Sequence, residues 1–441
     1  GNAAQKREHD KRLAGGTMSR AGAQCPCCSA INTMQDIRLE GQAGRLGSIM
    51  TTVVMDTPSG KDYRLPTKHE ITVATPTEEQ VCAAFEGVPF AVPDEPTPAG
   101  GGSGAGRAFG VQGYGLMKWR DLFTTRQLIA LGTLVQTTRS AREKLADVGF
   151  PTEWIEATGA FLSLAVDRVA ERNSALCHYD ITRDTVSGTF QRYALGINWD
   201  FAEAAPIGDS AGGYLGQVDW VSLFVSHGLK ASKCSPEPHA RNMSSTKSFG
   251  KVFDAIVTDP PYYDAIPYSD LMDYFYIWLR RSLYGLSDTI DAAYTQTLAP
   301  KWDHESNDGE LIDDSSRHEL NASKSKQTYE DGMARVFVQC SESLQPEGRL
   351  IIVFANKQPN AWETLVSAII KAGFVVDGSW PIQTEMSNRT RAHGAAALAS
   401  SVWLVCKKRA ATARPGWDNN VQEQMKSDIA IKIREFWDAG I

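Results

Sequence analysis

The sequence contains no run of about 18 consecutive apolar residues, the length that crosses a bilayer as a helix. The stretch Gly1–Gly16 also lacks the apolar core of a secretory signal. Cysteine is scarce, and eight cysteines in 441 residues are too few for a disulfide scaffold. Together these absences predict a cytoplasmic protein without a membrane partner.

A surplus of basic residues is missing too. The 45 Lys and Arg residues are outnumbered by 52 Asp and Glu residues, and the formal net charge is −7. An acidic balance does not by itself indicate nucleic-acid binding, which would then depend on a local basic patch. With 42% apolar and 22% charged residues, the composition is that of a globular protein and excludes a disordered chain, a collagen-like repeat and a coiled coil.

In the second half of the chain, short apolar runs alternate with helical patterns. The runs that predict strands are Phe253–Thr258, Leu350–Phe354, Val375–Trp380 and Ser401–Cys406. The patterns that predict helices are Tyr329–Leu344 and Trp362–Ala372. This alternation predicts an α/β sheet with helices on both faces.

Three weaker patterns have ordinary structural interpretations. The aromatic run Tyr274, Phe275, Tyr276 and Trp278 is predicted to pack within the helical part of the protein, with base stacking as the alternative. Asp167 and Arg168 lie side by side in a predicted helix and are interpreted as a local ion pair. The acidic stretch Asp303–Asp314 is predicted to be a solvated loop.

One motif stands out, Asp259-Pro260-Pro261-Tyr262, directly after the predicted strand Phe253–Thr258. Two prolines fix φ and remove backbone donors, so the chain stays extended beyond the end of the strand. In open α/β sheets this is the edge where ligands bind. The motif therefore places a carboxylate, carbonyl groups and a flat aromatic ring close together.

This set of groups suits an exocyclic amino group on a base that has left its helix. The lone pair of adenine N6 is delocalised into the ring, so the nitrogen is a poor nucleophile. If Asp259 and the Pro260 carbonyl accept its two N–H bonds, the nitrogen moves toward tetrahedral geometry, and Tyr262 stacks on the base. We therefore predict that Asp259, Pro260, Pro261 and Tyr262 are catalytic. A plain turn, with the aspartate as a helix cap, is the alternative.

The stretch Asp259–Arg281 resembles the signature of the zinc-ribbon-containing adenine-specific DNA methylases, a bacterial group often found beside anti-phage genes. The resemblance covers about residues 15–440. It is also carried by Tyr114-Gly115, Trp119–Phe123, Trp199–Glu203, Tyr329–Met333, Phe354–Lys357, Ser379–Glu385 and Ser400–Lys407. It implies methylation of adenine N6 in double-stranded DNA, with S-adenosylmethionine as the cofactor.

The resemblance also implies a Rossmann-like class I methyltransferase sheet with a helical insertion and a small N-terminal β/zinc-ribbon-like region. We accordingly expect five parts in the chain. They are a β-rich region with a zinc-knuckle remnant (1–95), a Pro/Gly linker (96–106), a helical region (107–182), the Rossmann-like methyltransferase region (183–410) and a C-terminal helix (411–441).

The sequence departs from the family at the cofactor. Family members hold it with a glycine-rich turn after their first strand, whereas the candidate here, Phe109–Gly115, follows a linker. We name Asp259 and Lys357 as cofactor-binding candidates, because both follow predicted strands at the ligand edge. Three interpretations stay open: a complete DNA methylase, a catalytically incomplete DNA-binding or assembly subunit whose partner chain supplies the cofactor-binding strands, and an enzyme that methylates RNA or a protein amide.

Two further sets of residues are candidates for binding. Cys25 and Cys28 have the C-x-x-C spacing of a zinc knuckle, but zinc takes four ligands and no second C-x-x-C occurs, so a zinc site and a vestigial knuckle both stay open. Arg389 and Arg391, together with His393 and the run Lys407-Lys408-Arg409, suit contact with DNA phosphates, with ordinary solvated surface charge as the alternative.

Overall fold

The computed structural model describes residues 4–5, 8–9, 15–19, 21–190, 193–208, 210–295, 298, 301–382, 401–410, 412–413 and 418–438. The chain forms two compact units, each built from two segments. Unit 1 comprises Gly1–Asn242 and Tyr263–Tyr329, and unit 2 comprises Met243–Tyr262 and Glu330–Ile441. The chain therefore returns to unit 1 directly after Tyr262, the last residue of the diproline motif.

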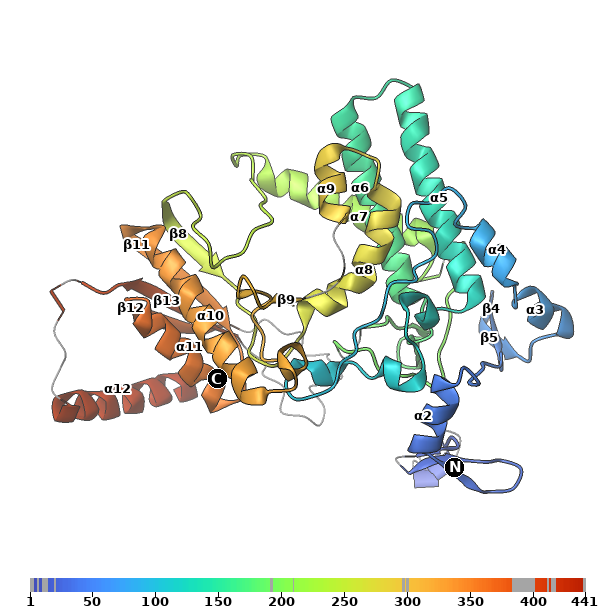
Figure 1. Ribbon diagram of the computed structural model, residues 1–441, viewed down its shortest axis with the longest axis horizontal. Helices are drawn as coiled ribbons and strands as arrows, with labels where there is room; N and C mark the ends of the chain where they lie inside the picture. The colour runs from blue at the N-terminus through green and yellow to red at the C-terminus, as the bar shows by residue number, and fades with distance from the viewer. Residues whose placement is uncertain are drawn as a thin grey trace. The chain divides into compact units, whose positions relative to one another are not determined.

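Unit 1 contains most of the helices (Figure 1). Its α-helices are α2 (Met34–Gln42), α3 (Lys68–Val73), α4 (Glu78–Ala83), α5 (Thr125–Asp147), α6 (Thr152–Arg172), α7 (Tyr214–Ser232), α8 (Tyr268–Leu283) and α9 (Asp288–Tyr294). Its short 3-10 helices are η1 (Ala105–Ala108), η2 (Val111–Tyr114), η3 (Trp119–Leu122) and η4 (Ser315–His318). The strands are β1 (Met18–Ser19), β2 (Gly22–Gln24), β3 (Ile31–Thr33), β4 (Val53–Thr57), β5 (Gly60–Arg64), β6 (Tyr179–Asp180), β7 (Thr185–Val186), β9 (Trp302–Asp303) and β10 (Asp308–Gly309).

The core of unit 1 lies among α5, α6 and α8, with α5 and α6 side by side (Figure 1). A capping box starts α5: the Thr124 hydroxyl accepts from the Gln127 N–H, and the Gln127 amide oxygen accepts from the Thr124 N–H. Tyr274 and Trp278 of α8 are 0% exposed and pack with Phe123. The prediction that these two aromatic residues serve packing is confirmed.

Arg281, near the end of α8, is a charged side chain that is 0% exposed. Its Nη1 and Nη2 donate to the two carboxylate oxygens of Glu95 at 2.8 and 3.0 Å. Its Nε donates to the carbonyl of Ala91 at 2.6 Å, and its Nη2 also donates to the carbonyls of Phe90 and Val92. The guanidinium thereby binds the irregular segment 90–95 to α8 and satisfies backbone carbonyls that lie far from Arg281 in the sequence.

The predicted ion pair between Asp167 and Arg168 is wrong. Arg168 Nε donates to Gln217 Oε1 at 2.9 Å, because adjacent residues of a helix point to different sides. Asp167 is 4% exposed, and its Oδ1 has no hydrogen-bond partner among the described residues. Burial raises the pKa of the Asp167 carboxyl well above its usual value. Burial therefore favours the neutral form of this carboxyl.

The prediction of a solvated acidic loop is wrong for the second half of Asp303–Asp314. Asp303 is exposed, but the side chains of Glu310 and Asp314 are only 13% and 2% exposed. Arg317 Nη2 donates to Glu310 Oε2 at 2.7 Å and to Asp270 Oδ2 at 2.6 Å. This buried cation compensates the carboxylates and so allows the stretch to fold against α8.

The glycine-rich residues 96–106, which we predicted to be a linker, contact the end of the same acidic stretch. The N–H groups of Ser103 and Ala105 donate to Ser315 Oγ at 2.7 Å and to the Asp313 carbonyl at 3.0 Å. Gly104 has φ +74°, and a Cβ there would lie 2.0 Å from the Asp313 carbonyl oxygen. A glycine is therefore required at this close approach.

Unit 2 is built on one mixed sheet with the strand order β12-β13-β11-β8 (Figure 1). Its strands are β8 (Phe253–Thr258), β11 (Leu344–Phe354), β12 (Phe374–Ile382) and β13 (Ser401–Lys408). Its helices are α11 (Pro359–Lys371) and α12 (Asp418–Asp438), and α10 (Ala322–Glu342) begins in unit 1 and ends in unit 2. β8 runs parallel to β11, and β13 is antiparallel to both β11 and β12. The predicted α/β class is thus confirmed at the level of a mixed sheet with helices.

The predicted strand Phe253–Thr258 coincides with β8, but β11 begins earlier than the predicted Leu350. Leu344 pairs with Phe253, and the register then shifts before Arg349. Pro346 and Gly348 lie inside this irregular stretch, where a missing donor and a missing side chain are tolerated. Among the described helices, none is long and apolar enough to cross a bilayer.

Replacing Glu95 with alanine should leave the buried Arg281 guanidinium without its carboxylate. We expect Glu95→Ala to lower the free energy of unfolding by about 3–5 kcal/mol, as for other broken buried pairs. Asp94→Ala is the matched control, because Asp94 is half-exposed and contacts Lys118 at the surface. Its cost should be about 0–1 kcal/mol. Urea unfolding of both variants measures the difference, and equal costs would contradict the importance of the buried pair.

The buried Asp167 carboxyl predicts a pH-dependent penalty on folding. Its unfolded form ionises near pH 4, whereas burial raises the pKa of the carboxyl in the folded form. The folded state then binds the extra proton, so stability falls as the pH rises from about 4 toward the folded pKa. Asp167→Asn should therefore be stabilising at pH 8 and less so at pH 5, as measured by urea unfolding. Asp147→Asn, an exposed carboxylate of α5, is the control; a pH-independent difference for Asp167→Asn would refute the assignment.

Candidate functional site

The diproline motif begins at the residue after β8, at the carboxyl end of the strand. Asp259 is exposed, while Pro260, Pro261 and Tyr262 are half-buried. The Tyr262 hydroxyl donates to Asp259 Oδ1 at 2.7 Å. The carboxylate and the phenol that were predicted to act together therefore lie in contact.

The ring of Tyr262 is held by an aromatic cluster at the ends of β11 and α11. It meets the ring of Phe354 edge-to-face, with 5.5 Å between the centroids. Phe354 is 0% exposed and meets Trp362 edge-to-face at 4.9 Å. Such contacts limit the orientations of the Tyr262 ring, so its hydroxyl is directed at Asp259 by packing as well as by the hydrogen bond.

Asn356 is a site residue that the sequence analysis did not single out. Its Nδ2 donates to the carbonyl of Tyr262 at 3.2 Å, and its own carbonyl accepts from Trp362 Nε1 at 2.9 Å. The available signal was its place directly after a predicted strand at the ligand edge. Lys357 has the same signal, but its side chain is exposed and its role in cofactor binding stays a prediction.

The described residues that follow β8 and β11 do not fit the cofactor cradle that the family resemblance implies. Asp259–Tyr262 follow β8 and Ala355–Lys357 follow β11, and neither stretch contains a glycine. The glycine-rich candidate Phe109–Gly115 belongs to unit 1, where it forms the short helix η2 and a bridge from Phe109 to Leu195. It does not connect a strand to an α-helix, which is the geometry that presents N–H groups to a bound nucleotide.

Cys25 and Cys28 lie in unit 1, in the turn between β2 and β3. The backbone N–H of Cys28, with smaller contributions from Cys27, lowers the pKa of the Cys25 thiol from its usual value. A thiolate at this position suits a zinc knuckle. In the part of the chain that the structure describes, however, no group of three His, Cys, Asp or Glu side chains is arranged to hold a metal ion. A bound zinc ion stays a prediction.

The predicted DNA-binding residues Arg389 and Arg391 lie outside the described residues. A described cation nearby in the sequence, Lys407 of β13, has its Nζ 2.5 Å from Asp377 Oδ1. This lysine therefore has a carboxylate partner on the surface of the sheet, which Arg349 shares.

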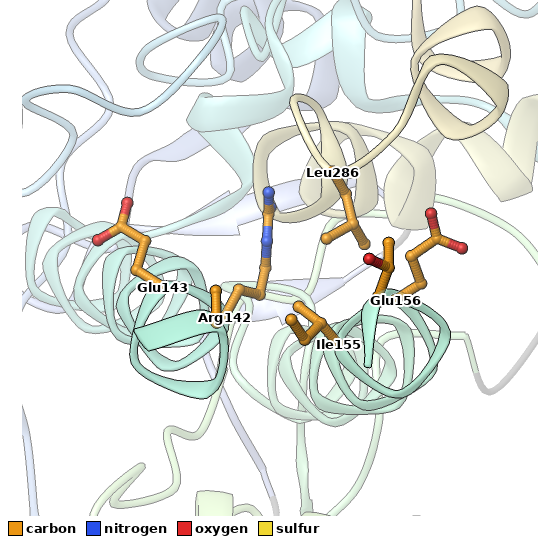
Figure 2. A pocket seen from close by; sticks show the side chains of 7 residues that line it. Arg142, Glu143, Ile155, Glu156 and Leu286 are labelled. Atoms are coloured by element: carbon orange, nitrogen blue, oxygen red, sulfur yellow. The ribbon is translucent and has the colours of Figure 1, made fainter. Parts of the chain in front are cut away.

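A separate hollow of about 250 Å³ lies between the adjoining ends of α5 and α6 (Figure 2). Its lining consists of Arg142, Glu143, Ala146, Thr152, Ile155, Glu156 and Leu286. Figure 2 shows Glu143 and Glu156 on opposite sides of the hollow, with Arg142 between them. The Arg142 guanidinium donates to the carbonyls of Ser282 and Gly285 at 2.7 and 3.0 Å. It therefore joins α5 to the end of α8, and the hollow contains no pair of charged groups directed at one ligand.

The comparison of this chain with models of known protein families found no match, and the comparison with curated proteins found none either. Two observations point to a function: the geometry of Asp259–Tyr262, called the diproline corner below, and the resemblance of the sequence to the methylase family. The corner combines an exposed carboxylate, carbonyl groups and a fixed aromatic ring at a strand end. These are groups that accept hydrogen bonds from an amino group and cover a planar ring.

Proposed function

We propose that this protein takes part in the S-adenosylmethionine-dependent methylation of adenine N6 in DNA. The observation that carries the proposal is the contact between Asp259 and Tyr262 at the exposed end of β8. The resemblance of Asp259–Arg281 to adenine-specific DNA methylases supports the same reaction. A Rossmann-like catalytic sheet, with double-stranded DNA as the partner, belongs to this proposal.

In this proposal the corner prepares the amino group of a flipped adenine. Asp259 and the carbonyl of Pro260 accept the two N–H bonds of N6, which draws the nitrogen out of conjugation with the ring. Tyr262 covers the face of the base, and the flipping costs a few kcal/mol of lost stacking and pairing. The Tyr262 hydroxyl occupies one lone pair of Asp259 Oδ1 and leaves other acceptor positions of the carboxylate for the substrate.

The second candidate is a catalytically incomplete DNA-binding or assembly subunit. It is favoured by the open edge of the sheet: in the described part of the chain, β8 pairs with β11 and with no strand on its other side. Val257 on this edge is 64% exposed. An exposed edge with an apolar residue is ready to pair with another strand. A partner chain that adds strands there would also supply the glycine-rich turn that β8 and β11 lack.

Asp259→Ala should abolish methyl transfer to DNA in a form of the protein that binds the cofactor. We expect a loss of at least about a hundredfold, the usual effect of removing a group that stabilises the reacting centre. The fold should stay intact, because Asp259 is exposed. Asp254→Ala, which removes an exposed carboxylate from β8 itself, is the control. Wild-type activity of Asp259→Ala in a radiolabelled-methyl assay would refute the role of the corner.

Titration calorimetry with S-adenosylmethionine separates the two candidates. Micromolar binding by the isolated chain would indicate a complete cofactor site, whereas an absence of heat supports the subunit that needs a partner. Because of the open β8 edge and the missing glycine-rich turn, we expect no binding until a second polypeptide is added. The radiolabelled-methyl assay is then run on DNA, RNA and protein, and transfer to RNA or protein alone would overturn DNA as the substrate.

A further inference from the structure

The ladder between β8 and β11 ends at the diproline. The last paired residues are Thr258 and Ile352, and Asp259-Pro260-Pro261 follow directly on the β8 side. Neither proline has an N–H group, so this side of the ladder cannot donate to β11 for two consecutive residues. The pairing of the two strands stops here, and the Asp259 carboxylate at the strand end is exposed.

A side chain closes the gap that the prolines open. Four residues beyond the last pair on each chain, from Thr258 to Tyr262 and from Ile352 to Asn356, the Nδ2 of Asn356 donates to the Tyr262 carbonyl at 3.2 Å. This hydrogen bond from the side-chain amide joins the two segments at a point where the ladder has already ended. The opened segment is therefore fixed at both of its ends.

Asn356 is itself held in place by two further bonds. Its Oδ1 accepts from the backbone N–H of Gln358 at 2.8 Å, so the amide group is oriented with Nδ2 toward Tyr262. Its carbonyl accepts from Trp362 Nε1 at 2.9 Å, which ties it to the first turns of α11. Because the Asn356 side chain is already restrained, its hydrogen bond to the Tyr262 carbonyl costs little side-chain conformational entropy.

We propose that Asn356 is a positioning residue that sets the place of Tyr262 relative to Asp259. Tyr262 is then fixed at three points: its carbonyl by Asn356, its ring by Phe354 and its hydroxyl by Asp259. Without the Asn356 side-chain amide, the Tyr262 carbonyl loses this hydrogen bond, which is the backbone restraint at the residue that carries the ring. The inference deepens the proposed function and rests on it for the catalytic consequence, but the positioning itself is a property of the free protein.

Asn356→Asp is the sharpest test, because the aspartate keeps the oxygen that accepts from Gln358 and replaces the donor to Tyr262 with a charged oxygen that repels the carbonyl. Amide hydrogen exchange, followed by mass spectrometry on peptides that cover Tyr262–Asp264, reports the position of the corner. We expect exchange about three- to tenfold faster, as for the loss of one hydrogen bond. Asn360→Ala, an exposed asparagine in the first turn of α11, is the matched control and should exchange like the wild type.

The kinetic consequence is a lower kcat with little change in KM. A corner that is displaced by a fraction of an ångström still binds DNA but holds the amino group badly, so kcat should fall about 10- to 100-fold. Asn356→Ala should behave in the same way, and protection of the β11 amides shows that either variant has folded. Unchanged exchange at Tyr262–Asp264 overturns the inference, and so does faster exchange with full activity. If the wild type transfers no methyl group to any substrate even with a second polypeptide that supplies cofactor binding, the proposed function fails, and the exchange result alone decides whether Asn356 positions Tyr262.

Discussion

Two consecutive prolines stop the hydrogen-bond ladder between β8 and β11, and the candidate site depends on this interruption. A residue with a free N–H at position 260 or 261 would be able to continue the pairing and draw the corner against β11. The prolines instead leave Asp259 exposed at the strand end. The surrounding side chains then restore order: Phe354 and Trp362 pack beside Tyr262, and Asn356 binds its carbonyl. A rigid site thus arises where the sheet itself has stopped.

In unit 1 a buried charged side chain, Arg281, binds backbone carbonyls that no regular secondary structure satisfies. The segment Phe90–Glu95 has no regular hydrogen-bonding pattern, yet it runs beside the core, where free carbonyl groups are costly. Arg281 supplies donors to three of these carbonyls and to the Glu95 carboxylate. The guanidinium is suited to this task because it is planar and always charged. In the same way Arg317 binds Glu310 to Asp270 of α8.

Predictions of structure whose outcome depends on neighbouring residues were correct, whereas those whose outcome depends on contacts between distant residues were wrong. The strand Phe253–Thr258 was placed correctly, because a short apolar run before two prolines has few other structures open to it. The burial of Tyr274 and Trp278 followed from helical spacing in the same way. The burial of the second half of Asp303–Asp314 was not predicted. The stretch is strongly acidic, and its compensating cation Arg317 is a single residue that lies beyond it in the sequence. Asp167 was misjudged because a charged residue in a helix normally faces solvent, and packing of α6 against its neighbours decided otherwise.

By itself, the sequence determined the local features: the rigid corner after β8, the strands and helices around it, and the capping box that begins α5. These depend on fixed dihedral angles, missing donors and apolar spacing, all of which act within a few residues. Only the tertiary structure decided that Asn356 binds the carbonyl of Tyr262 and that Arg281 binds Glu95. Asparagine and arginine side chains accept many partners, so the partner that each one takes depends on which distant segments the packing of the core brings within about 3 Å.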